Sequence, residues 1–171
     1  MKSWNEFVCD QPELAGEGKR MFLQTREYVG LAFLATLRKD GAPRLHPVSV
    51  VFSQEGLFVF IPGSSPKCAD LLRDGRYALQ AFPPTQNEAG MEFCLSGAAQ
   101  CIQSLARREA IIAETGVHVA EHEVCFELLL DRAMFTSLVD RDTPNEHAEH
   151  SIWRAADEYH AADAFFKQPT P

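Results

Sequence analysis

Apolar positions change their spacing near residue 30, and this change separates a helical beginning from a strand-rich remainder. Residues 12–29 place Leu14, Met21 and Phe22 at loosely helical spacing, which predicts an N-terminal helix. Beyond residue 30, short apolar runs alternate with turn signals, a pattern typical of antiparallel strands. We therefore expect a short helical segment followed by a β domain.

The β region predicts a meander of strands joined by tight turns. An Asp-Gly pair at 40–41 is a hairpin signal, and Gly56 turns the chain into a third strand. Glycines end the helices that we predict at 66–75 and 104–116. The expected strands cover 31–38, 43–53, 57–61, 76–82, 91–102, 123–139 (one long strand or two) and 150–155.

These elements predict an α+β fold that is mainly β, an antiparallel six-stranded β-barrel, closed or partly closed, with flanking helices. Loops are expected at 83–90 and 140–150. The chain then has three parts: a helical segment packing on the barrel (1–29), the barrel domain (30–155) and a C-terminal tail expected to be partly disordered (156–171).

Net charge and the lengths of the apolar runs argue against nucleic-acid and membrane partners. The 171 residues carry a formal net charge of -8, and a net negative surface repels phosphate backbones, so we expect no nucleic-acid partner. No apolar run approaches the ~18 residues that span a bilayer, and the N-terminus lacks an apolar signal core, so we expect a cytoplasmic protein with no membrane partner. The five cysteines form no Cys-x-x-Cys pair and are expected to be buried free thiols.

Known catalytic motifs are missing from the sequence. It contains no Gly-x-Ser-x-Gly, no Gly-x-Gly-x-x-Gly and no Walker-type loop, which disfavours nucleophilic hydrolysis and nucleoside-triphosphate chemistry. His118 and His122 are four residues apart but lack the His-Glu-x-x-His pattern, and His147 and His150 lie in an acidic loop. We expect no metal site, and the catalytic residues stay unknown.

The stretch IPGSSPKC, 61–68, combines a strand end, a turn and a helix start. Ser64 and Ser65 supply hydroxyls, Lys67 supplies a charge, and the first turn of the helix leaves amides free, which are the parts of an anion site. The alternative is that the serines only cap the helix. Arg44 lies on the strand that pairs with this one, so it could approach the same point and complete a phosphate site.

The order of motifs resembles the pyridoxamine 5′-phosphate oxidase-like family of FMN-binding split-barrel flavoproteins. The resemblance covers residues 30–82. It is carried by LAT (34–36), KDG (39–41), PR (43–44), PV (47–48), SPK (65–67) and LLRDGR (71–76), with a weaker match at WR (153–154).

This resemblance implies FMN as the cofactor and a homodimer with flavin at the interface. It makes Arg44, Ser65 and Lys67 the phosphate ligands. It lays the strand segment His46, Pro47, Val48 and Ser49 along the isoalloxazine ring, and it puts Trp153 near the partner's site. Two departures stand out: the turn is Ser-Pro-Lys rather than Ser-Arg-Lys, and the arginines and histidine that grip pyridoxal phosphate have no match. We therefore do not expect vitamin B6 oxidation.

The function expected is an FMN-dependent oxidoreductase acting on a small-molecule substrate, in which the flavin carries the hydride chemistry. His46 is the nearby candidate proton donor, although a strand histidine bonded to backbone is the simpler interpretation. Two alternatives stay open: an F420-dependent reductase of the same fold, and a non-enzymatic flavin- or haem-binding protein. Haem would need an axial ligand, for which His118, His122, His147 and His150 are available. The substrate would be selected by loops 83–90 and 140–150 and by the partner subunit.

Overall fold

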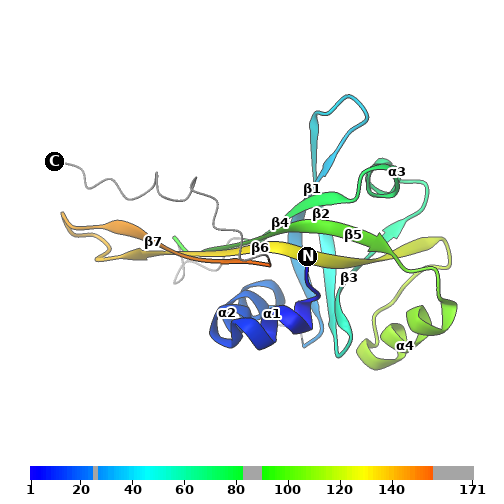
Figure 1. Ribbon diagram of the computed structural model, residues 1–171, viewed down its shortest axis with the longest axis horizontal. Helices are drawn as coiled ribbons and strands as arrows, with labels where there is room; N and C mark the ends of the chain where they lie inside the picture. Colours follow the sequence, from blue (N-terminus) through cyan, green and yellow to red (C-terminus); the bar gives the residue numbers. More distant parts are fainter. Residues whose placement is uncertain (25–26, 83–89, 156–171) are drawn as a thin grey trace.

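The computed structural model describes residues 1–24, 27–82 and 90–155, and within them it has one antiparallel sheet and four helices (Figure 1). The strands are β1 (Val29–Leu37), β2 (Pro43–Ser53), β3 (Gly56–Pro62), β4 (Arg76–Ala81), β5 (Glu92–Cys101), β6 (Glu123–Val139) and β7 (His147–Arg154). The helices are α1 (Trp4–Asp10), α2 (Pro12–Leu23), α3 (Pro66–Arg73) and α4 (Leu105–Thr115).

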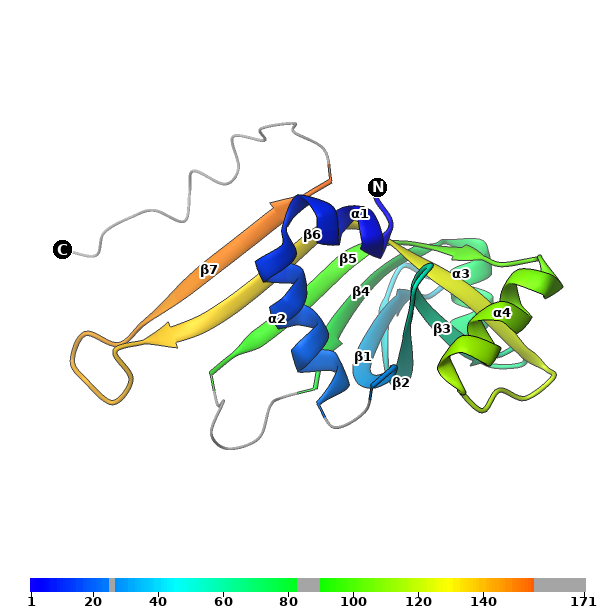
Figure 2. The same ribbon diagram turned by 90° about the horizontal axis from the view of Figure 1, so that it is seen from below.

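Six of these strands close a barrel. The sheet order is β3-β2-β1-β4-β5-β6-β7, and β3 also pairs with β6, which joins the two ends of the six-stranded part. The seventh strand, β7, pairs only with the far half of β6, from Arg132 opposite Arg154 to Val139 opposite His147. Figures 1 and 2 show the resulting β6–β7 arm projecting away from the barrel. The predicted six-stranded split barrel with flanking helices is confirmed.

The long strand β6 serves both the barrel and the arm because it bends at a bulge in its pairing with β5. The register shifts between Ser96 and Gly97. A Cβ at Gly97 would lie 1.9 Å from the carbonyl oxygen of Leu129, so only glycine permits this close backbone approach. The sequence pattern at 123–139 left one strand or two open, and the structure has a single strand.

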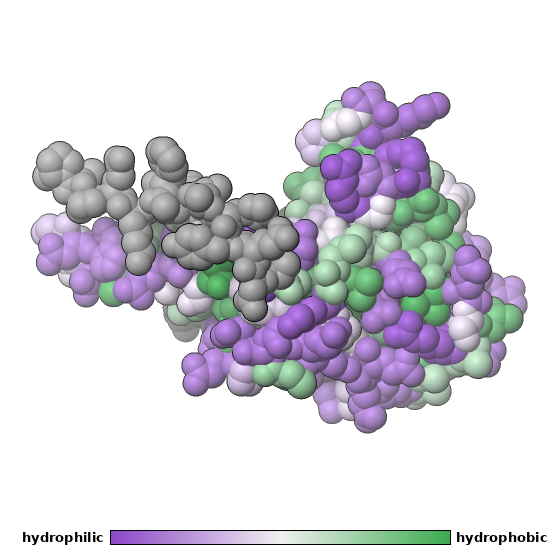
Figure 3. All heavy atoms as spheres, viewed as in Figure 1, coloured by the Kyte–Doolittle hydropathy of each residue, from purple (hydrophilic) through white to green (hydrophobic). Residues whose placement is uncertain are grey.

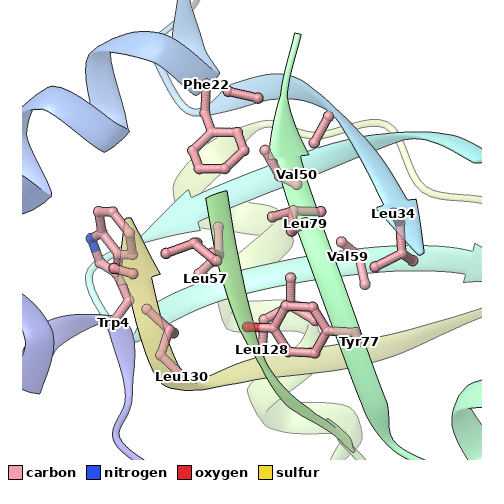
Figure 4. Packing of buried hydrophobic residues seen from close by; sticks show 14 of the residues in the cluster. Trp4, Phe22, Leu34, Val50, Leu57, Val59, Tyr77, Leu79, Leu128 and Leu130 are labelled. Atoms are coloured by element: carbon pink, nitrogen blue, oxygen red, sulfur yellow. The ribbon is translucent and has the colours of Figure 1, made fainter. Parts of the chain in front are cut away.

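The barrel interior is filled by aliphatic and aromatic side chains that alternate along the strands (Figure 4). Helices α1 and α2 add aromatic rings to this core: the ring of Trp4 lies edge-on to Phe52 at 5.0 Å, and Phe22 lies edge-on to Phe93 at 5.7 Å. Burial of such rings is the main contribution that holds the N-terminal segment on the barrel.

Helix α1 was not predicted, although the sequence contains its signal. Ser3 and Glu6 form a capping box, in which the amide of Glu6 donates to the Ser3 hydroxyl and the amide of Ser3 donates to the Glu6 carboxylate. Strand β7 begins at His147, three residues before the prediction, because its exposed polar residues carry no apolar alternation. The predicted loop at 83–90, except for Gly90, and the predicted tail at 156–171 lie outside the described residues.

All five cysteines are free thiols, and two of them, Cys68 and Cys125, are buried. Cys94 and Cys101 are half-buried and Cys9 is exposed, so the expectation of burial holds for only part of the set. Burial raises the pKa of the Cys125 thiol to about 12, which keeps it protonated. No helix in the described ranges combines the length and the apolar character needed to cross a bilayer.

Candidate functional site

A hollow of about 560 Å³ lies where β2 passes the beginning of α3. It brings together four residues that the sequence analysis assigned to one cofactor: Pro47, Val48 and Ser49 of β2, and Lys67 of α3. These come from separate parts of the chain, since β3 lies between them in sequence. Cofactor and ligand sites usually have volumes of roughly 300–1,000 Å³, so this hollow is large enough for a flavin-sized molecule.

The alternation of β2 decides which of its side chains turn outward. Leu45, Pro47 and Ser49 are exposed, whereas Val48 and Val50, which each follow an exposed residue, are buried in the barrel. Pro47 and Ser49 therefore present the outer surface of the strand to the hollow. Ser49 supplies a hydroxyl that can donate or accept a hydrogen bond there.

The turn before α3 supplies both a cap and a cation. The hydroxyl of Ser65 accepts a hydrogen bond from the amide of Cys68 at 3.3 Å, so Ser65 is the N-cap of the helix. Within the described part of the chain, neither the amide nor the ammonium group of Lys67 has a hydrogen-bond or ion-pair partner. Lys67 is half-buried, and its two donors at a helix N-terminus suit an anion.

Arg44 lies at a different hollow from Lys67. Its Nε donates to Oδ2 of Asp70 at 2.7 Å, and Arg44 lines a hollow of about 430 Å³ between the β1–β2 turn and α3. Asp70 also accepts from the hydroxyl of Thr36 at 3.0 Å and from Nη1 of Arg73 at 3.2 Å. Arg44 and Lys67 therefore line two separate hollows, and the buried carboxylate of Asp70 holds the Nε of Arg44. That the two cations bind one phosphate stays a prediction.

The pKa of Asp70 lies below its ordinary value. Burial by itself raises this pKa, but the hydrogen bonds from Arg44, Arg73 and Thr36 lower it more strongly. The carboxylate therefore stays ionised and keeps two guanidinium groups in place beside α3.

Two further predicted residues lie apart from the hollow. His46 is half-buried on β2 opposite Leu34, and its ring has no hydrogen bond to another described residue. Trp153 is 7% exposed, its Nε1 donates to Asp10 at 3.2 Å, and its ring lies 4.7 Å from that of Phe7. The side chain of Trp153 is thus enclosed by its own chain.

The hollow also has a wall formed by residues that were not expected at a flavin site, although His118 was a candidate haem ligand. Gly116, Val117 and His118, which follow α4, lie opposite the strand, and His118 is exposed. No local signal marks these residues, because only the folding of α4 against the barrel brings them near β2. The remaining lining residues are Val29, Val51, Phe60, Pro62 and Glu123.

In the described ranges, no group of three or more His, Cys, Asp or Glu side chains is placed to hold a metal ion. His118 and His122, which the sequence analysis considered as a pair, do not form part of such a group.

Comparison with known proteins supports the fold and leaves the family open. No protein-family model and no curated protein matches the sequence. Among solved structures, ChuZ from Campylobacter jejuni is 13% identical with a TM-score of 0.58, over 74% of this chain and 56% of that chain. The heme binding protein from Mycobacterium smegmatis is 14% identical with a TM-score of 0.56, over 78% of this chain and 56% of that one.

PhzG from Burkholderia lata, in complex with tetrahydrophenazine-1-carboxylic acid, matches over more of its length. It is 14% identical with a TM-score of 0.51, over 90% of this chain and 93% of that chain. This chain spans only 56% of the ChuZ and mycobacterial chains, so those proteins contain additional structure. At these identities the likeness shows a shared split-barrel fold.

Proposed function

We propose that the hollow between β2 and α3 binds FMN and that the protein is an FMN-dependent oxidoreductase acting on a small molecule. The observation that carries this proposal is the meeting of Pro47, Val48, Ser49 and Lys67 at one hollow. The resemblance to the pyridoxamine 5′-phosphate oxidase-like family assigns these same four residues to flavin. PhzG, a fold neighbour crystallised with a phenazine-type acid, is consistent with a site for a flat polycyclic molecule.

The residues present fit the charge and shape of FMN. The ammonium and amide of Lys67, which have no partner among the described residues, suit a phosphate monoester, and the Ser65 cap fixes the turn that presents them. The outward side of β2 gives a planar ring a surface of Pro47 and strand backbone, with the Ser49 hydroxyl at its edge. When bound, FMN supplies the hydride-transfer chemistry. The protein positions the ring and limits the access of water, so no protein acid or base is required.

Arg44 has a supporting place in this proposal. Its bond to Asp70 fixes the guanidinium beside α3, the helix that carries Lys67. From there its positive charge favours a phosphate at the helix start through space.

We further propose that a second copy of the chain covers the flavin. Leu45, which is 63% exposed, shares the outward side of β2 with Pro47 and Ser49, and Leu31 on β1 is 51% exposed. Figure 3 shows apolar side chains on the barrel surface, whereas the tip of the β1–β2 hairpin is polar. An exposed apolar face that continues into a ligand hollow is typical of an interface.

Haem is the second candidate, and one residue favours it. His118 is exposed at the rim of the same hollow and offers an imidazole as an axial ligand. The mycobacterial fold neighbour is itself a heme binding protein. The protein would then store or carry haem rather than catalyse a reaction of flavin.

An absorption spectrum of the purified protein, before and after addition of FMN, tests the proposal, followed by mass analysis of the released chromophore. Two flavin bands and released FMN would support it. A single violet band would indicate F420, and a Soret band that His118→Ala removes would indicate haem. A colourless protein that binds none of the three would overturn the assignment, and the Ser-Pro-Lys turn would then be only a helix cap.

A further inference from the structure

A second hollow, of about 420 Å³, lies between the N-terminal helices, the β2–β3 turn and α4. Figure 2 shows the β2–β3 turn between α2 and α4. This hollow shares no lining residue with the one between β2 and α3. It is therefore a separate feature of the molecule, and nothing in the proposed flavin chemistry uses it.

One residue of this hollow is not explained by packing. Gly16 is in the interior of α2, where glycine is less favourable than alanine, yet a Cβ there would meet nothing within 4 Å. Gly18, two residues on, is different, because a Cβ there would lie 2.3 Å from the ring of Phe93. The fold requires Gly18 but does not require Gly16. Bare backbone at Gly16 leaves room in the hollow, as a site that receives a ligand would need.

Two opposite charges line the hollow without pairing. The ammonium of Lys19 lies 6.0 Å from the ring centroid of Phe52, and no described residue forms a salt bridge with it. Oε1 of Glu114 accepts the amide of Gln54 at 2.7 Å, and its other oxygen has no partner in the described ranges. A third titratable group, Tyr28, has its pKa raised first by its hydrogen bond to Glu27 and also by the charge of Glu114. The hollow therefore offers one cation and one anion.

The rest of the wall is mixed. Asn5, Tyr28, Ser53 and Gln54 are polar, and Trp4 and Phe52, which are only 4% and 2% exposed, lie behind the hollow. The apolar surface that a ligand can reach is at Val8, which is 37% exposed, and at Pro12. Such a surface favours an apolar group.

We propose that this hollow binds a zwitterionic amino acid with an aromatic side chain. Its carboxylate pairs with Lys19 and its ammonium group with Glu114, while its ring lies over Gly16 and against Val8 and Pro12. This site goes beyond the flavin proposal and does not depend on it.

Calorimetric titration of the full chain with L-phenylalanine tests the site, with two matched probes that each lack one charge. We expect phenethylamine and 3-phenylpropionate to bind at least tenfold more weakly than L-phenylalanine. Lys19→Gln should weaken L-phenylalanine and 3-phenylpropionate but not phenethylamine. Glu114→Gln, whose amide oxygen can still accept from Gln54, should weaken L-phenylalanine and phenethylamine but not 3-phenylpropionate.

Gly16→Leu should abolish binding by filling the hollow while the melting temperature stays equal or rises, because leucine favours helix and meets no atom there. Gly16→Ala should weaken binding in part, with folding likewise retained. FMN affinity should be unchanged in both variants, which separates this test from that of the flavin site. No binding of L-phenylalanine to the wild type at about 10 mM, equal binding of all three probes, or unchanged binding by Gly16→Leu would each overturn the proposal.

Discussion

The Nε of Arg44 and Oδ2 of Asp70 lie 2.7 Å apart, and this bond fastens the second barrel strand to the helix that begins beside the candidate flavin site. The Asp70 side chain is 5% exposed and that of Arg44 is 27% exposed, so the pair is shielded on one side only. Loss of the carboxylate would remove a charge-assisted bond from both Arg44 and Arg73, and this gives Asp70 a measurable role in stability. Nη2 of Arg73 would keep its bond to the carbonyl oxygen of Leu37.

We expect Asp70→Asn to lower the free energy of unfolding by about 1.5–3 kcal/mol, because it removes charge-assisted bonds to two guanidinium groups. Urea denaturation of the wild type and the variant measures the difference. Asp40→Asn is the matched control: its pair with Arg38 is largely exposed, so we expect a change within about 0.5 kcal/mol. Equal effects of the two substitutions would contradict a special role for Asp70.

The difference between wild type and Asp70→Asn should depend on pH in one direction. Because the folded pKa of Asp70 is lowered, its contribution is complete above the ordinary aspartate pKa of about 3.9 and is lost as the pH falls through the lower folded value. We therefore expect the difference in unfolding free energy between the wild type and Asp70→Asn to shrink as the pH is lowered from about 7 to about 3, as measured by urea denaturation at several pH values. A difference in unfolding free energy that grew toward low pH would contradict a lowered pKa for Asp70 in the folded protein.

Gly97→Ala should destabilise the barrel strongly, by about 2–4 kcal/mol, because the new Cβ would fall 1.9 Å from the Leu129 carbonyl oxygen at the β5–β6 bulge. Gly16→Ala is the control. The new Cβ meets no atom there and alanine favours the helix, so we expect the free energy of unfolding to rise by about 0.5–1 kcal/mol. Thermal unfolding of both variants measures this contrast. A stable Gly97→Ala protein would mean that the bulge is not as close as described.

The sequence was sufficient for most of the fold because its signals are local. The Asp-Gly turn and the apolar pattern after it predict both ends of β2, Pro43–Ser53. The order of the predicted strands and helices predicts the barrel. Helix α1 was missed although Ser3 and Glu6 mark its start. The beginning of β7 at His147 had no pattern to reveal it, since its pairing with β6 is made by the backbone and its side chains there are exposed.

The site was predicted less completely, for a geometric reason. Pro47, Ser49 and Lys67 line one hollow, whereas Arg44 is bound by Asp70, a contact that depends on how α3 is rotated against the strand. His118 reaches the same hollow from beyond α4, which no spacing in the sequence indicates. Residues that meet through tertiary packing alone leave no local signal.

Leu45→Glu should convert the proposed dimer to a monomer, because it puts a charge on the apolar outward side of β2. Light scattering after size exclusion should give twice the 19.1 kDa chain mass for the wild type and the single mass for the variant. Leu105→Glu is a control at a residue of α4 that is 72% exposed and does not line the proposed flavin hollow, and this variant should stay dimeric. A monomeric wild type would contradict the covered flavin site.

The most direct measurement is the affinity for FMN of the wild type, Lys67→Ala and Lys39→Ala, followed by quenching of flavin fluorescence. Lys67 lines the proposed flavin hollow, whereas Lys39 is an exposed lysine at the other hollow beside Arg44. We predict that Lys67→Ala weakens the binding of FMN by about 1.5–3 kcal/mol, roughly 10- to 150-fold in affinity, and that Lys39→Ala has little effect. Equal affinity for the wild type and Lys67→Ala, or no binding of FMN by the wild type, would contradict it.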